Sequence, residues 1–178
     1  GTVTVESGGN FIQTTNATAA HAGTGNFVVR RQSVGGYNAW SAPVVGGNLP
    51  GSNGYQYNSA TGTSDPADDN NPDPDPGWSA FSGAMQASRG YYSSNAGLAT
   101  FNGKANNGTY NSVGVTAEGA PGTRYNLVGN PYPSSIDADQ FINDNSGTID
   151  GSLYFWDDDN TGPSGYTPND YATYTLNG

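Results

Sequence analysis

The chain has 178 residues, enough for one domain with a substantial core or for two small packed sheets. Hydrophobic residues make up 33% and charged residues only 11%, so the composition indicates a folded, turn-rich protein with a polar but mostly uncharged surface. The net charge of −10, with five basic residues, argues against nucleic acids and anionic membranes as partners, because phosphate binding requires clustered lysine or arginine.

Short alternating or β-branched runs recur along the chain, separated by Gly, Asn, Pro or Asp clusters. They predict strands at residues 2–7, 10–15, 26–33, 54–60, 89–94, 98–103, 108–116, 124–130, 152–157 and 170–177. This pattern is typical of an all-β fold, and we expect an antiparallel β-sandwich, with a jelly-roll arrangement left open. The first and last runs, TVTVES and YATYTL, are expected to be edge strands that can pair with a neighbouring molecule.

We expect a single module over residues 1–178. The opening residues, GTVTVESGGNF, already alternate like a strand and do not resemble a signal peptide. No apolar run approaches the ~20 residues that a membrane-spanning helix requires, so no transmembrane segment is expected.

An acidic, proline-rich segment at residues 63–77 is unlike the rest of the chain. It carries five Asp and four Pro, and the prolines remove hydrogen-bond donors from any strand ladder, so it is predicted to be a loop. Asp73 and Asp75 are followed by Gly77 at alternating positions, which suits Ca²⁺. A solvated loop without a cation is the alternative.

One short helix is predicted near residues 134–143. Ser134 or Ser135 is the expected N-cap, and Gly147 is the expected end. The preceding Asn130-Pro131-Tyr132-Pro133 is interpreted as a rigid turn that leads into the helix, because a residue before proline avoids helical backbone.

The run SLYFWDDDNTGPSGY places aromatic residues directly before three carboxylates. The strand at 152–157 is expected to be an inner strand with both faces covered, followed by an acidic hairpin tip. Asp157, Asp159 and Thr161, followed by Gly162, match the first half of a calcium loop. The match stops at Pro168, where such a loop has a bidentate Glu, so a bare acidic tip and a Ca²⁺-occupied tip both stay open.

Aromatic side chains are the remaining candidates for ligand binding. Those considered for stacking on sugar rings are Trp40, Trp78, Tyr37, Tyr55, Tyr57, Tyr91 and Tyr92. Trp40 is expected to belong to the core instead. Trp78, Tyr91 and Tyr92 are the preferred glycan contacts, although Tyr91 and Tyr92 must point to opposite faces of their strand.

The sequence argues against an enzyme. His21 is the sole histidine, lies among small residues and has no acid beside it, so a Ser–His site is not expected. Zero cysteines exclude disulfides and thiolate chemistry, and with one histidine they exclude the usual zinc sites by count.

Several stretches together resemble a known region. In chain order they are VTVESGGNFIQ, GNFVVRRQS, YNAWSAPVVGG, ATFNGKANNGTY, YNLVGNPYPSSIDADQFI, GSLYFWDDDN and NDYATYTLNG. This set resembles a region common in large cell-surface and secreted proteins of Bacteroidetes that end in a type IX secretion sorting domain. The resemblance implies an all-β module exported to the cell surface or the medium, and it implies no catalytic role. It also implies that the module is part of a longer chain, because members of this family usually continue past both ends of the matching region.

Two functions of different classes follow as hypotheses. The first is a non-catalytic, extracellular structural or adhesive module, including the subunit of a self-assembling surface filament. The second is a Ca²⁺-dependent carbohydrate-binding module. The expected partners are accordingly other copies of the chain or neighbouring domains of the same chain, and glycans.

Overall fold

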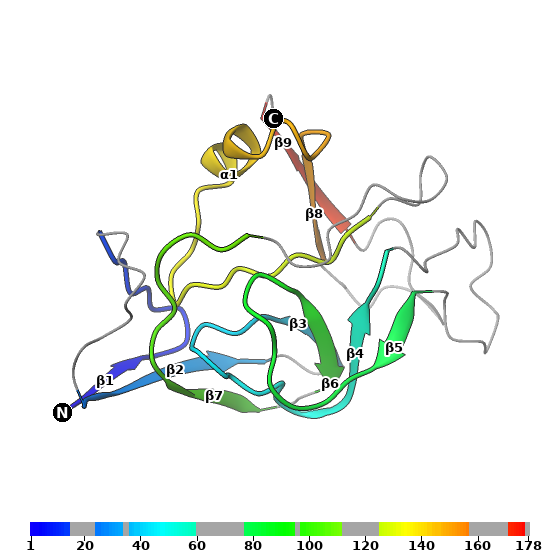
Figure 1. Cartoon of the computed structure of the whole chain (residues 1–178). Coiled ribbons are helices and arrows are strands. Elements are labelled where there is room, and N and C mark those ends of the chain that lie inside the picture. Colours follow the sequence, from blue (N-terminus) through cyan, green and yellow to red (C-terminus); the bar gives the residue numbers. More distant parts are fainter. Residues whose placement is uncertain are drawn as a thin grey trace. The chain divides into compact units, whose positions relative to one another are not determined.

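The computed structural model describes residues 1–14, 24–33, 36–59, 77–94, 97–111, 125–156 and 171–176. The chain forms two compact units, Gly1–Asp65 with Pro74–Ser135, and Pro66–Asp73 with Ile136–Gly178. Strands predominate in both, and the described residues contain one short helix, α1 (Figure 1). The predicted all-β class with one short helix is confirmed, and the single module expected over residues 1–178 stays a prediction.

One sheet of the first unit contains three strands in the order β1-β2-β7. They are β1 (Thr2–Val5), β2 (Asn26–Gln32) and β7 (Leu98–Gly103). β1 runs parallel to β2 with Val5 opposite Val29, and β2 runs antiparallel to β7 with Val29 opposite Phe101. Residues opposite one another share a face of the sheet, so these three side chains form one wall of the core.

The second sheet of this unit contains four strands in the order β3-β6-β4-β5, and all neighbours are antiparallel. They are β3 (Tyr37–Trp40), β6 (Tyr91–Ser94), β4 (Ser52–Tyr57) and β5 (Trp78–Ala80). A register shift between Ser52 and Tyr55 bends β4 where Asn53 has φ of 51°. Asn tolerates this left-handed backbone better than most residues.

The two sheets share a core. The rings of Trp40 on β3 and Phe101 on β7 have centroids 6.2 Å apart, and Tyr91 on β6 contacts Phe81 at 4.5 Å. Trp40 is 7% exposed, which confirms its predicted place in the core. Two sheets that bury their inner faces against each other form a β-sandwich. The predicted antiparallel sandwich is therefore confirmed, with β1–β2 as its one parallel pair among the described strands.

Residues 125–135 follow the sandwich as an extended segment fixed by side-chain hydrogen bonds. The Asn130 side chain accepts from Tyr132 N at 2.9 Å and donates to Ser134 O at 2.6 Å, which makes a rigid turn of the NPYP sequence. Asn106, fully buried, donates to Pro131 O at 3.0 Å. The structural interpretation of this motif is thus confirmed.

The helix of the second unit, α1 (Ala138–Asp144), begins later than predicted. Its N-cap is Asp137, whose carboxylate accepts from Gln140 N at 3.0 Å, so the prediction of Ser134 or Ser135 as the cap is wrong. The backbone N–H and the hydroxyl of Ser135 instead donate to the Asn10 side chain, at 2.7 and 3.1 Å.

The end of α1 also differs from the prediction. Asn145 is the C-cap, and its backbone N–H is bonded to Asn143 O and Ile142 O, so the helix closes before Gly147. Ile142 is the buried residue of this short helix.

The second unit also contains a two-stranded antiparallel ribbon, β8 (Ser152–Trp156) and β9 (Tyr171–Thr175). Trp156 and Tyr171 lie opposite each other with ring centroids 5.1 Å apart. The prediction that β8 is an inner strand is wrong, because within the described residues it pairs with β9 alone. Phe155 on β8 is consequently 52% exposed.

Other predicted strands are absent where the structure describes them. Residues 10–14, 108–111 and 125–130 form no strand, apart from a single bridge at Val128, whereas β3 and β5 were not predicted. No helix in the described part of the chain is long and apolar enough to cross a membrane.

Candidate functional site

Aromatic side chains gather on the face of the four-stranded sheet that points away from the core. Trp40 and Tyr91 point inward, so the alternating residues of β3 and β6 point outward, and the register carries this outer face to β4 and β5. The rings on it, which we name the aromatic face, are Tyr37, Tyr55, Tyr57, Trp78 and Tyr92. All five are half-buried.

The rings of the aromatic face contact one another. Trp78 lies between Tyr57 and Tyr92, with centroid distances of 5.1 and 5.4 Å. Tyr37 and Tyr55 lie 6.1 Å apart. These separations fall in the range where tilted and edge-to-face aromatic pairs attract, so the side chains stabilise one another.

A row of directly opposed residues crosses the middle of this face, one from each strand. In the order β3-β6-β4-β5 the row is Ala39, Tyr92, Tyr55 and Ala80. Both alanines are exposed. Two tyrosines are thus opposed in the middle of the row, with small residues at its ends, while Tyr37 and Trp78 lie on either side of it along the strands.

A shallow pocket of ≈ 340 Å³ opens at the β5 end of the row. Its lining residues are Asn53, Gly54, Tyr55, Ala80, Phe81 and Ser82. Gly54 is required in this wall, because a Cβ atom there would lie 2.3 Å from Phe81 O and 2.4 Å from a methyl group of Leu49. An aromatic ring beside a side-chain amide and a hydroxyl is a common arrangement in binding sites for small polar molecules.

Two hydrogen bonds fix the end of β4 that carries Tyr57. The guanidinium of Arg89 donates to Tyr57 O at 2.8 Å, and Asn58 N donates to Gly77 O at 2.8 Å just before Trp78. These bonds fix the opposed pair Tyr57 and Trp78, between which the acidic segment of the sequence is inserted.

The three predicted glycan contacts do not all lie on one surface. Trp78 and Tyr92 lie together on the aromatic face, whereas Tyr91 is 1% exposed and its hydroxyl oxygen accepts from Gln86 N at 2.9 Å inside the sandwich. The expectation that Tyr91 and Tyr92 point to opposite faces is confirmed, and Tyr91 is not available to a surface ligand. Asn53 and Ser82 were missed, because a lone Asn or Ser in a glycine-rich turn carries no signal of its own.

The candidate calcium ligands, Asp73, Asp75, Asp157, Asp159 and Thr161, lie outside the described residues, so both calcium sites stay predictions. His21 also lies outside them. Within the described residues, no group of three or more His, Cys, Asp or Glu side chains could hold a metal ion.

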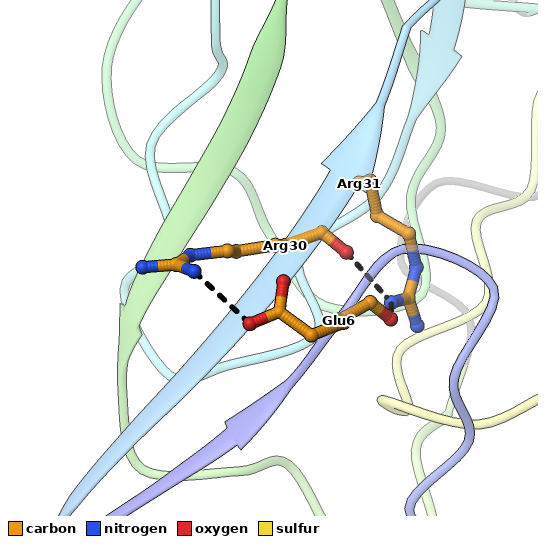
Figure 2. A network of polar contacts seen from close by, with 3 residues as sticks. All are labelled: Glu6, Arg30 and Arg31. Carbon is orange, nitrogen blue, oxygen red and sulfur yellow. Dashed lines mark hydrogen bonds and ion pairs between the residues drawn. The ribbon is translucent and has the colours of Figure 1, made fainter.

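A network of polar contacts among Glu6, Arg30 and Arg31 holds β2 to the segment that follows β1 (Figure 2). Arg30 donates to the Glu6 carboxylate at 3.0 Å in an exposed ion pair, a kind that contributes about 0–1 kcal/mol. Arg31 donates to backbone carbonyls of Arg30 at 2.9 Å and Pro133 at 3.4 Å, and burial lowers the pKa of its guanidinium below its ordinary value. Both cations are therefore engaged by the protein itself.

The fold and this site define an all-β sandwich protein with an uncharged aromatic face on one sheet. The chain belongs to a family described as a domain of unknown function (DUF8693), whose model matches residues 1–178. No curated protein and no solved structure matches the chain.

Proposed function

We propose that this chain is a non-catalytic, extracellular adhesive module that binds carbohydrate through the aromatic face. The observation that carries the proposal is the gathering of five aromatic side chains from four strands on the outer surface of one sheet. A packed core does not require this arrangement, because the opposite face of the same sheet already supplies the core.

The chemistry of the face suits a sugar. A pyranose ring has an apolar face of C–H groups that stacks on an aromatic ring, and hydroxyl groups around its edge that need hydrogen bonds. Tyr and Trp combine an apolar body with a polar group, so they serve both needs. Asn53 and Ser82 in the adjoining pocket add one amide and one hydroxyl.

The proposed setting and the absence of catalysis rest on the sequence. The resemblance to Bacteroidetes surface proteins supports export to the cell surface or medium by type IX secretion. The single histidine and the lack of cysteine leave few ways to build a nucleophilic or zinc-dependent site.

Calcium dependence is the finer part of this proposal. The segment that joins β4 to β5 contains Asp73 and Asp75, and the two strands that it joins carry Tyr57 and Trp78. Binding measured in Ca²⁺ and in EDTA separates a calcium-dependent module from an independent one.

A structural role as a filament subunit is the second candidate, and one observation favours it. β1 forms an edge of its sheet, and its exposed residues include Val3 but no charged residue. An uncharged edge strand without proline lacks the usual protection against pairing with another chain. If the purified protein stays monomeric at high concentration, and deletion of residues 1–7 leaves native surface structures unchanged, this second role is wrong.

Co-sedimentation with insoluble polysaccharides tests the main proposal. The wild-type chain is expected to sediment with at least one neutral polysaccharide, and the combined Tyr55→Ala and Trp78→Ala variant is expected to stay in solution. Tyr154→Ala is the matched control, because Tyr154 is an exposed tyrosine on β8 and not part of the aromatic face. Equal sedimentation of all three chains would exclude the aromatic face as the binding site.

A further inference from the structure

We infer that the β8–β9 ribbon is a docking site for an extended, cationic segment of another protein, which adds to the edge of β9 as a third strand. The inference goes beyond the proposed carbohydrate binding, because the aromatic face belongs to the other unit of the chain. It is carried by three observations on the second unit: the exposure of β9, an exposed ring opposite a small residue, and charges of one sign.

The backbone and both faces of β9 are open. Residues 171–174, four of its five residues, are exposed, whereas only Tyr154 and Phe155 are exposed on β8. In the described part of the chain β9 pairs with β8 alone, and it contains neither proline nor a charged residue. An edge strand of this kind lacks the usual protection against pairing with another chain, and two strands alone are marginally stable. A third strand would therefore stabilise the ribbon and satisfy its open edge.

One face of the ribbon is apolar and has a gap over Ala172. The register places Leu153 opposite Tyr174. It places Phe155 opposite Ala172 on the same face. The Ala172 methyl is too small to cover the neighbouring ring, and Phe155 is 52% exposed. An apolar side chain on a third strand, next to Ala172, would reach the Phe155 ring and remove apolar surface of both from water.

Charge selects a cationic segment. The second unit carries eleven Asp, three in Pro66–Asp73 and eight in Ile136–Gly178, and it has no Lys, Arg or His. Helix α1 lies beside β9 at one end of the apolar face, where the Tyr174 hydroxyl donates to Asp139 at 2.8 Å (Figure 1). That bond, followed by burial and the charges of Asp139 and Asp137, raises the pKa of Tyr174, so both carboxylates act at this end. Lysine or arginine beside an apolar run would be attracted to them.

A second copy of the chain does not match this surface. Two copies of the second unit repel each other, because each carries only negative charge. The uncharged edge strand β1 of another copy brings no cation either, because residues 1–25 contain no lysine or arginine and Glu6 follows the strand. The occupant is therefore a different protein with basic residues beside an extended apolar run.

Calorimetry with the whole chain and three synthetic peptides tests the inference. The first peptide alternates valine with threonine and has two lysines at each end. The second has glutamate in place of lysine, and the third has serine in place of valine. The lysine–valine peptide is expected to bind, with an affinity that falls as the salt concentration rises. The other two are expected to bind roughly tenfold more weakly or not at all.

Two variants place the peptide on the ribbon. Phe155→Ser removes the exposed ring and is expected to weaken binding of the lysine–valine peptide roughly tenfold. Asp139→Asn keeps an oxygen that accepts from Tyr174 but removes the charge, so it is expected to weaken binding about threefold and to reduce the salt dependence. Leu98→Ser is the matched control, because Leu98 is 50% exposed on β7 in the first unit, and it is expected to change nothing.

Hydrogen exchange measured by mass spectrometry tests the strand addition itself. Binding of the lysine–valine peptide is expected to slow the exchange of backbone amides in β9, because a third strand covers its edge. Exchange in β5, on the first unit, is expected to stay unchanged.

Equal binding of the lysine and glutamate peptides, no binding of the lysine–valine peptide, or unchanged exchange in β9 would overturn the inference. A dimer of the chain in analytical ultracentrifugation that Phe155→Ser abolishes would also overturn it, because a second copy would then cover the ribbon. Failure of the chain to bind any carbohydrate would overturn the proposed function and leave this inference in place.

Discussion

Two faces of one sheet use the same kinds of side chain for different purposes. On the inner face Tyr91 is buried against the other sheet of the sandwich, and its hydroxyl oxygen accepts a backbone hydrogen bond from Gln86. On the outer face Tyr92, the next residue, is half-buried and contacts Trp78. The position of a tyrosine along its strand therefore decides whether it packs in the core or lies on the aromatic face.

The β8–β9 ribbon lacks this division. Its aromatic side chains are exposed on both faces, as Tyr154 and Phe155 on adjacent positions of β8 show. Two strands alone are marginally stable without further packing, so the sandwich sheet, with one face buried, is the better scaffold for a rigid site.

The largest expected effect is that of Tyr91→Ala. Removing a fully buried aromatic ring loses its transfer free energy and leaves a cavity, so the free energy of unfolding is expected to fall by about 3–5 kcal/mol. Urea denaturation measures this loss. Tyr92→Ala is the matched neighbour, and an equal loss there would contradict the division between the faces.

Tyr91→Phe sharpens the comparison within the core. The ring stays, but the Gln86 N–H loses its acceptor in a partly buried place, which is expected to cost about 1–2 kcal/mol of unfolding free energy. The dependence of the unfolding free energy on urea should keep its slope. A stabilised Tyr91→Phe variant would show that this hydrogen bond contributes nothing.

Sequence reasoning reached the fold class and part of the site. Alternation within RGYYSS predicted that Tyr91 and Tyr92 point to opposite faces, but polar or small residues flank both, so nothing local indicated which one points inward. The sheet decides this, because Tyr91 lies opposite Trp40 across the β3–β6 ladder. The row across four strands depends on register between distant segments, which local patterns do not encode.

The missed and misplaced elements have local causes. β5 is three residues long and follows four prolines, so its sequence predicts a loop. It is a strand because it pairs with β4. Residues 10–14 alternate like a strand but pair with no neighbouring strand. A side-chain hydrogen bond helps to fix this segment, because the Gln13 amide donates to Asn106 O at 2.7 Å. The helix start was misplaced because several polar residues compete as caps before Asp137.

Trp78→Ala measures how much the aromatic face contributes to the free energy of unfolding. Loss of the two ring contacts with Tyr57 and Tyr92 is expected to lower the free energy of unfolding by about 1–3 kcal/mol, since each aromatic pair contributes about 0.5–1.5 kcal/mol. Thermal unfolding measures the change. A loss as large as that of Tyr91→Ala would show that the aromatic face stabilises the fold as much as the core does.

The smallest expected effect concerns Tyr174 on the ribbon. Its hydroxyl donates to Asp139 at 2.8 Å, and this bond, followed by burial and the nearby negative charges of Asp139 and Asp137, raises the pKa of Tyr174 above 10.0. The bond is present below pH 10 and is lost as the pH rises through the raised pKa. Tyr174→Phe is therefore expected to lose slightly less thermal stability between neutral and strongly alkaline pH than the wild type. An identical alkaline loss in the variant would contradict a contribution from this bond.

Intrinsic fluorescence tests the central claim most directly, because the chain has three tryptophans in three environments: Trp40 in the core, Trp78 on the aromatic face and Trp156 on β8. Titration with a soluble fragment of a polysaccharide that the chain binds is expected to change the emission of the wild type and of Trp156→Phe. In Trp78→Phe the change should be lost while calorimetry still detects weakened binding. A full fluorescence change in Trp78→Phe would place the sugar elsewhere and contradict the aromatic face as the binding site.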